Sequence, residues 1–292
     1  MTQAAVRPGT ESPATPQVRV LQRDDLAAAV RVLSTNPIDN VFVAARVRSN
    51  GVDPGRLGCQ LWGFVREGAV RSLCHAGSNL VPVNADPQAV TAFAEFAGPR
   101  RMCSSIIGPA PVAMDLWAQL SRRWGSEWAQ TREIRSSQPV LALDTDPVIA
   151  PNRDVRPVTI EHWDAYYQAA LKMYTEEVGV SPLIGNPAGY RYYVRQLITS
   201  GRAFAVYDRD RVVFKADLGS ISSTVSQVQG VWLDPSLRGR GLAPAMMAAV
   251  VRYARRAAPI VSLYVNDFNA PARATYARVG FHQTGEFATI LY

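Results

Sequence analysis

The fold is decided by the stretch Arg238-Gly239-Arg240-Gly241-Leu242-Ala243. It follows a β-like run that ends at Leu233 and precedes an apolar helical run that extends to about Ala257. Glycines let the backbone turn tightly and approach a ligand closely, and the free N–H groups at the start of a helix attract anions. A solvated surface turn is the commoner explanation of so short a pattern, so the flanking residues must decide between it and a phosphate site.

Length and composition indicate two soluble domains. The chain has 292 residues, of which 48% are hydrophobic, enough for one large core or two ordinary ones. No apolar run reaches the roughly 20 residues that cross a bilayer, and the first 17 residues lack the apolar segment of a secretory signal. We therefore expect a cytoplasmic protein with no membrane partner.

Charge and metal-ligating residue types narrow the classes of partner. The net charge of +7 suits an anionic ligand, but the arginines are dispersed along the chain, which favours a phosphate-bearing small molecule over nucleic acid. The cysteines are odd in number and form no CxxC pair, and the three histidines are far apart. We therefore expect neither a metal site nor a disulfide framework.

The chain divides into four segments by composition. Residues 1–17 are rich in proline and predict a disordered leader, and residues 144–153 have the composition of a linker. Residues 18–143 and 154–292 are then the two domains. Both open on a short strand followed by a helix, and both contain a hairpin, with strands at 61–66 and 69–76 in the first and at 202–207 and 211–218 in the second. This shared order suggests an ancient duplication.

The last third of the chain alternates between strand and helix patterns. A strand ends at residue 233, and the pattern continues with a helix at 242–257, a strand at 260–265, a helix at 271–278 and a strand at 281–291. Pro244 and Pro271 fall in the first turns of the two helices, where a missing N–H costs little. The 238–243 stretch is therefore a strand-to-helix junction in an α/β domain.

Two separated motifs in residues 154–292 resemble those of the GCN5-related N-acetyltransferase (GNAT) superfamily. The pyrophosphate motif is matched by Arg238, Gly241 and Ala243. A second motif is matched by Asn269, Ala272, Tyr276, Gly280 and Phe281. The first half resembles the degenerate amino-terminal half of tandem acetyltransferase-like proteins. The resemblance implies an α/β fold of two GNAT-like domains, each a mixed, mostly antiparallel sheet flanked by helices.

The resemblance also implies a site for acetyl-CoA. The pyrophosphate would bind the backbone amides of residues 238–243 at the positive end of the following helix. The pantetheine arm would lie between two diverging strands, in contact with Val231, Leu233 and Asn269. Tyr276 would donate a proton to the departing thiolate, although its spacing also fits a tyrosine that only packs the helix on the sheet.

The general base departs from the family pattern. Members often place glutamate on the strand before the phosphate turn, whereas Gln227 and Gln229 stand there in this chain. Glu177 is the candidate that we select, since a carboxylate near the acceptor can attract a cationic amine or receive its proton. Asp217 or a water chain that ends at a backbone carbonyl are alternatives.

Together these patterns predict direct acetyl transfer from acetyl-CoA to a primary amine of a small molecule, peptide or protein. Neither a metal nor an acyl-enzyme is required. Because no phosphate turn is evident in the first half, we expect it to support the acceptor cleft. The missing strand glutamates leave a noncatalytic acyl-CoA-binding or regulatory protein as the alternative. Nothing in the sequence indicates the oligomeric state.

Overall fold

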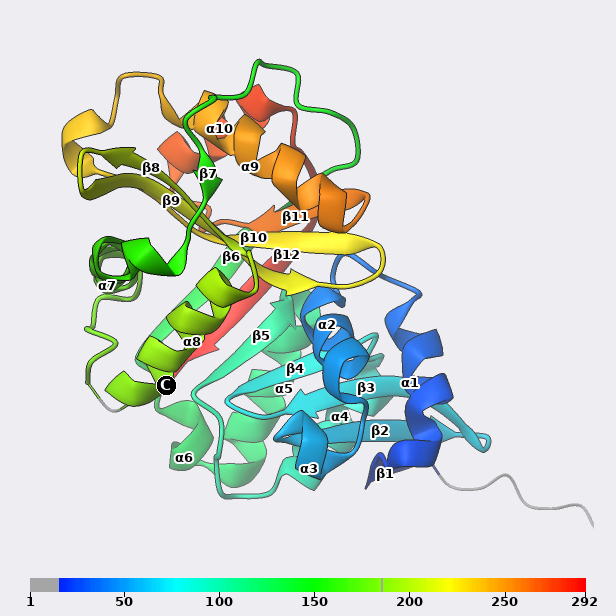
Figure 1. Cartoon of the computed structure of the whole chain (residues 1–292). Coiled ribbons are helices and arrows are strands. Elements are labelled where there is room, and N and C mark those ends of the chain that lie inside the picture. The colour runs from blue at the N-terminus through cyan, green and yellow to red at the C-terminus, as the bar shows by residue number, and fades with distance from the viewer. Residues whose placement is uncertain (1–15, 185) are drawn as a thin grey trace, which may run out of the picture.

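The computed structural model describes residues 16–184 and 186–292 (Figure 1), so the predicted leader lies almost entirely outside the described residues. The first half comprises β1 (Gln17–Val20), α1 (Leu26–Leu33), α2 (Val41–Asn50), α3 (Pro54–Leu57), β2 (Gln60–Arg66), β3 (Ala69–Ala76), β4 (Asn79–Val83), α4 (Pro87–Ala97), β5 (Ser105–Pro109), α5 (Ala110–Trp124), α6 (Ser126–Ala129) and β6 (Glu133–Leu143).

The second half follows the same order of elements. It comprises β7 (Arg156–Pro157), α7 (Trp163–Val178), α8 (Pro187–Thr199), β8 (Ala203–Asp208), β9 (Arg211–Ile221), β10 (Val225–Leu233), α9 (Ala243–Ala257), β11 (Ile260–Tyr264), α10 (Ala270–Val279) and β12 (His282–Leu291). Each half contains one parallel pair joined through a crossover helix: β4 with β5 through α4, and β10 with β11 through α9. The repeated order confirms a tandem α/β fold.

The two halves are joined in one 12-stranded sheet of order β1-β2-β3-β4-β5-β12-β6-β11-β10-β9-β8-β7. β12, the last strand of the second half, pairs with β5 of the first, and β6, the last strand of the first half, pairs with β11 of the second. β6 and β12 are antiparallel neighbours at the centre. Each half therefore completes its sheet with a strand from the other.

Helices cover both faces of the sheet. On the second half, α9 and α10 bury their apolar sides against β9, β10 and β11, and α7 and α8 form a separate apolar cluster with β8. On the first half, α4 and α5 cover one face, while α1 and α2 form a cluster with β2, β3 and β4. Met247, Val250 and Val251 of α9 have no exposed surface, so this helix is fixed firmly behind the 238–243 turn.

Local patterns predicted the hairpins and the last third of the chain within a residue or two. Pro244 and Pro271 lie in the first turns of α9 and α10, and Gly280 ends α10 with a φ of 111°. The patterns did not indicate α2, α8, β4, β5 or β6. β6 was not predicted because its first half is mostly polar, with Ile134 exposed, and because its middle contains Pro139, which is unusual inside a sheet.

Candidate functional site

A wedge opens between β10 and β11. The strands are paired at three register positions only, the last being Gln227 with Ser262. Beyond this point β10 contains a bulge between Gln229 and Trp232, where Gly230 has a φ of +56°. Ligands of α/β sheets bind beyond the carboxyl ends of parallel strands. We refer to this gap as the β10/β11 wedge.

The 238–243 turn lies at the carboxyl end of β10. Gly239 and Gly241 have φ values of 75° and 71°, and no atom lies within 4 Å of the Cβ that another residue would carry at either position. Leu242, which precedes α9, provides no side-chain cap. The N–H groups at the start of α9 are therefore open to an anion.

Arg238 joins this turn to α7. Its guanidinium donates two hydrogen bonds to Glu176, at 2.6 and 2.9 Å, and its Nε donates to the Leu233 carbonyl at 3.0 Å. Hydrogen bonding by Arg238 lowers the pKa of the Glu176 carboxyl. Arg240 is exposed at the turn and adds positive charge. The two arginines therefore differ, since one braces the turn and the other faces solvent.

Val231, Leu233 and Ser262 lie on the two strands that border the wedge. Val231 and Leu233 are half-buried and pack against the apolar core beneath α9. The hydroxyl of Ser262, at the last paired position, is buried and has no hydrogen-bond partner within the part of the chain that the structure describes. An unpaired buried hydroxyl is costly, so a ligand that hydrogen-bonds there would be favoured.

The charge of Glu177 affects the pKa of Tyr276, although the two residues are far apart in the sequence. Tyr276 of α10 is 6% exposed, and burial, with a smaller contribution from the charge of Glu177, raises its pKa. Glu177 keeps access to solvent but is enclosed by protein on most sides, and this enclosure raises the pKa of its carboxyl. The positive charges of Arg135 and Lys215 oppose that shift. The charge of Glu177 is therefore felt at the Tyr276 hydroxyl.

Asn269 is the residue immediately before α10. Its side-chain oxygen accepts a hydrogen bond from the Ala272 N–H at 3.2 Å and so caps the helix. The residue is exposed. Contact between Asn269 and a cofactor arm remains a prediction, and the structure adds a capping role that the motif did not reveal.

The other candidates for the base differ in availability. Gln227 is buried on β10, and Gln229 donates a hydrogen bond to the Tyr193 hydroxyl. The Asp217 carboxylate accepts hydrogen bonds from Lys215 and Tyr166. Glu177 is exposed to solvent, whereas Asp217 is buried.

Two functional neighbours were missed in the sequence. Arg135 of β6 donates to the Glu177 backbone carbonyl at 2.9 Å, so the first half supports the end of α7. Lys215 lies fully buried on β9. The available signal was a lysine and an aspartate two positions apart in the apolar run 212–218, because such a pair faces one side of a strand.

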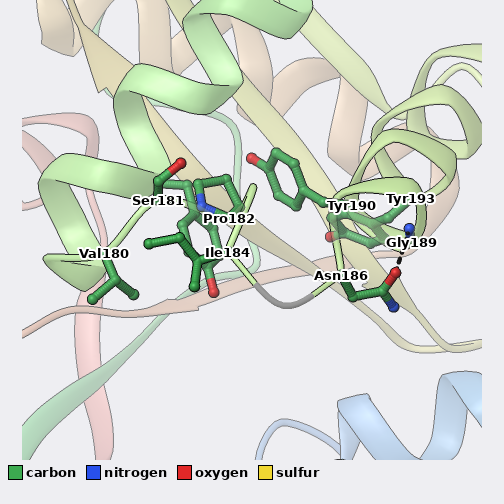
Figure 2. Close-up of a pocket in the computed structure, with 9 residues that line it drawn as sticks. Val180, Ser181, Pro182, Ile184, Asn186, Gly189, Tyr190 and Tyr193 are labelled. Carbon is green, nitrogen blue, oxygen red and sulfur yellow. Dashed lines mark hydrogen bonds between the residues drawn. The ribbon is translucent and has the colours of Figure 1, made fainter.

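A cavity of about 450 Å³ lies between the end of α7 and the start of α8. Figure 2 shows Val180, Pro182 and Ile184 on one side of it and Tyr190 and Tyr193 of α8 on the other. Tyr193 also receives the hydrogen bond from Gln229 of β10. The cavity therefore borders the strand that forms the wedge.

The structure offers neither a metal centre nor a membrane span within the residues that it describes. Within residues 16–184 and 186–292, no group of three or more His, Cys, Asp or Glu side chains has an arrangement suited to a metal ion. No helix in the same part of the chain is long and apolar enough to cross a membrane.

A splayed parallel strand pair that leads to an uncapped, glycine-rich helix start is an arrangement of α/β proteins that suits an anionic ligand. Residues 160–281 match the acetyltransferase (GNAT) family, and residues 59–166 match a domain of unknown function, DUF4081. The chain thus carries a GNAT domain behind a DUF4081 domain. The family implies acyl transfer from acyl-CoA.

Solved structures share the fold over nearly the whole chain. A GNAT protein from Sphaerobacter thermophilus is 17% identical, with 96% of each chain covered and a TM-score of 0.56. A Drosophila protein is 12% identical, with 95% of this chain and 99% of that one covered and a TM-score of 0.65. A tandem GNAT protein from the clavulanic acid biosynthesis pathway is 13% identical, with 94% and 98% covered and a TM-score of 0.53. No curated protein sequence gives a significant match.

Proposed function

We propose that the chain transfers an acetyl group from acetyl-CoA to a primary amine by direct attack. The observation that carries this proposal is the uncapped start of α9 at the mouth of the β10/β11 wedge. Residues 238–243 would hold the pyrophosphate, while Val231, Leu233 and Asn269 would contact the pantetheine arm. Ser262 adds a buried hydroxyl at the last paired position of the two strands, and it has no partner among the residues that the structure describes.

The side chains supply the proton transfers. Acetyl-CoA supplies an activated acyl group as a thioester. An alkyl amine with a pKa of about 10.4 is mostly protonated at neutral pH, so Glu177 would accept its proton directly or through water. Tyr276 would donate to the departing sulfur. Its raised pKa keeps the phenol protonated at neutral pH and therefore available as a donor.

The acceptor would enter from the side of α7 and α8. The cavity there is lined mainly by apolar and tyrosine side chains, and Glu177 lies three residues before Val180 on its wall. Aromatic rings attract cations as well as apolar groups. This arrangement supports a cationic amine as the acceptor, whether it belongs to a small molecule or a peptide.

The experiment is a paired measurement of binding and turnover. Titration calorimetry should show binding of acetyl-CoA, and a thiol reagent should detect CoA release with at least one amine of a broad panel. Tyr276→Phe should lower kcat by about 10²-fold, the lower end of the range for a lost general acid, with little change in the Kd of acetyl-CoA. The matched control is Tyr253→Phe on α9, which should preserve both.

A noncatalytic acyl-CoA-binding protein is the second candidate. The observation that favours it is the presence of Gln227 and Gln229 on β10, because neither amide is a useful base. Acetyl-CoA binding without thiol release across the whole amine panel would support this candidate against the transferase.

A further inference from the structure

A buried ion pair lies beneath the bulge of β10. Lys215 and Asp217 of β9 share one face, their Nζ and Oδ2 atoms are 2.6 Å apart, and their side chains are 0% and 5% exposed. Tyr166 of α7 donates its hydroxyl to the other oxygen of Asp217. All three side chains are thus removed from water and joined to one another.

Stability alone gives little reason for this pair. Removing two charges from water is costly, and apolar side chains of similar size often replace a buried pair with no loss of stability. Lys215 is one of two lysines in the chain, and the other, Lys172, is exposed on α7. A lysine kept in so unfavourable a place points to a task for its ammonium group.

The second bond of Lys215 indicates that task. Its Nζ donates to the Gly230 carbonyl at 2.8 Å. That carbonyl belongs to the same peptide unit as the Val231 N–H, and an ammonium at one end of a peptide polarises it and strengthens the N–H as a donor. Gly230 and Val231 have no register partner on β9 or on β11.

The bulge is shaped around the ion pair. A Cβ at Gly230 would lie 2.9 Å from both the Lys215 Nζ and an Asp217 carboxylate oxygen, so a larger residue there would displace the ion pair. Its φ of +56° also favours glycine. The charges and the backbone turn are therefore parts of one arrangement at the wall of the wedge.

We propose that Lys215 is a positioning residue that fixes and polarises the Gly230–Val231 peptide, so that the Val231 N–H can bind the carbonyl oxygen of an acyl thioester. Asp217 and Tyr166 hold the ammonium in place. The inference rests on the proposed function, because it requires a thioester in the β10/β11 wedge.

Infrared spectroscopy of bound acetyl-CoA, isotopically labelled at the acetyl carbonyl, tests this proposal without an acceptor. A polarised carbonyl absorbs at lower frequency, so the wild-type chain should shift the band down from that of free acetyl-CoA. Lys215→Met combined with Asp217→Asn leaves no uncompensated charge and keeps an acceptor for Tyr166. We expect this double variant to bind acetyl-CoA as tightly as wild type while its band returns most of the way to the free value.

The matched control is Lys172→Met, which removes the other lysine and should leave the band unchanged. With an amine that supports turnover, kcat of the double variant should fall by up to about 10²-fold, the loss seen when one oxyanion-hole donor is removed. If the double variant binds acetyl-CoA and its band stays at the wild-type frequency, the proposed role of Lys215 is wrong, while the proposed function still stands. Failure of the wild-type chain to bind acetyl-CoA overturns the proposed function, and this inference with it.

Discussion

The two halves use the same crossover in opposite ways. In the first half, residues 84–86 join β4 to α4, and Asp86 caps the helix by accepting from the Ala89 N–H at 2.8 Å. Asp86 is also paired with Arg66 at 3.0 Å. In the second half, residues 234–242 join β10 to α9, whose start has no side-chain cap. In the first half, the carboxylate of Asp86 thus occupies the start of the crossover helix. In the second half, no side chain of the described residues occupies the start of α9.

The comparison teaches that the fold was repeated while the anion site was not. The first half still contributes to the second, because β6 lies beside β11 and its Arg135 holds the backbone carbonyl of Glu177. The exchange of β6 and β12 means that neither half has a complete sheet alone. We therefore propose that the first half supports the cleft and that the second carries the chemistry.

The largest expected effect is loss of the base. Glu177→Gln should lower kcat by about 10²-fold or more, because an amide cannot accept the amine proton. The wild-type rate should rise with pH through the pKa of Glu177, which enclosure raises above the ordinary glutamate value, since only the carboxylate is a base. The variant should lack that limb of the pH–rate profile.

The control for the base is Glu127→Gln on α6 of the first half, an exposed glutamate far from the wedge in sequence. It should keep the wild-type rate and pH profile. If Glu177→Gln retains full activity with the same acid limb, the base lies elsewhere, and a water chain becomes the better account.

The second effect concerns the glycine turn that the first half lacks. Gly241→Val places a β-branched residue at a φ of 71°, which costs on the order of 1–3 kcal/mol and moves the N–H groups of the turn. The Kd of acetyl-CoA should rise by roughly 10-fold to 10²-fold, as measured by calorimetry, if that strain falls on the bound state. Gly68→Val, at a φ of 72° in the β2–β3 hairpin, is the matched control and should leave the Kd unchanged.

A third variant makes the second half more like the first. Leu242→Asp introduces a carboxylate at the start of α9, where it would compete with the pyrophosphate for the positive end of the helix. Acetyl-CoA affinity should fall several-fold, while the free energy of unfolding stays level or rises by about 0.3–1 kcal/mol. Calorimetry should therefore show weaker acetyl-CoA binding, while thermal unfolding of the same preparation shows no loss of stability. Unchanged affinity would mean that the start of α9 is not the anion site.

The smallest effect concerns the brace between α7 and the turn. Arg238 and Glu176 are 44% and 48% exposed, so Glu176→Gln should lower the free energy of unfolding by only about 0.2–1 kcal/mol. Because Arg238 lowers the pKa of Glu176, this stabilisation is present above the ordinary glutamate pKa and is lost as the pH falls through the folded-state value. The unfolding temperatures of wild type and variant should therefore become equal at acid pH. A difference that persists there would mean that the stabilisation does not come from the ionised Glu176.

Local signals predicted the parts of the fold that local forces determine. The strand, glycine turn and helix around residues 238–243 follow from periodicity and from glycines with positive φ. The exchange of β6 and β12 was not predictable in this way, since it depends on pairing between strands about 150 positions apart, such as Leu141 with Gln283. Polar β6 pairs with β11 and β12 because tertiary contacts override its weak strand pattern.

The candidate site was predictable to a similar degree. Motif spacing selected Tyr276 of α10, and charge in the acceptor segment selected Glu177 of α7, and the charge of Glu177 acts on Tyr276 only in the folded chain. The pairing of Lys215 with Asp217 was hidden because burial of a charged pair depends on Tyr166 and Gly230, which are distant in sequence. Spacing thus identified the turn, whereas the buried network needed the structure.

The most direct test of the difference between the halves is the stoichiometry of acetyl-CoA binding to the full chain, measured by titration calorimetry. The open start of α9 and the capped start of α4 predict one molecule bound per chain, with binding weakened by Gly241→Val and preserved by Gly68→Val. Two molecules per chain, no binding, or equal binding by the Gly241 variant would contradict the account.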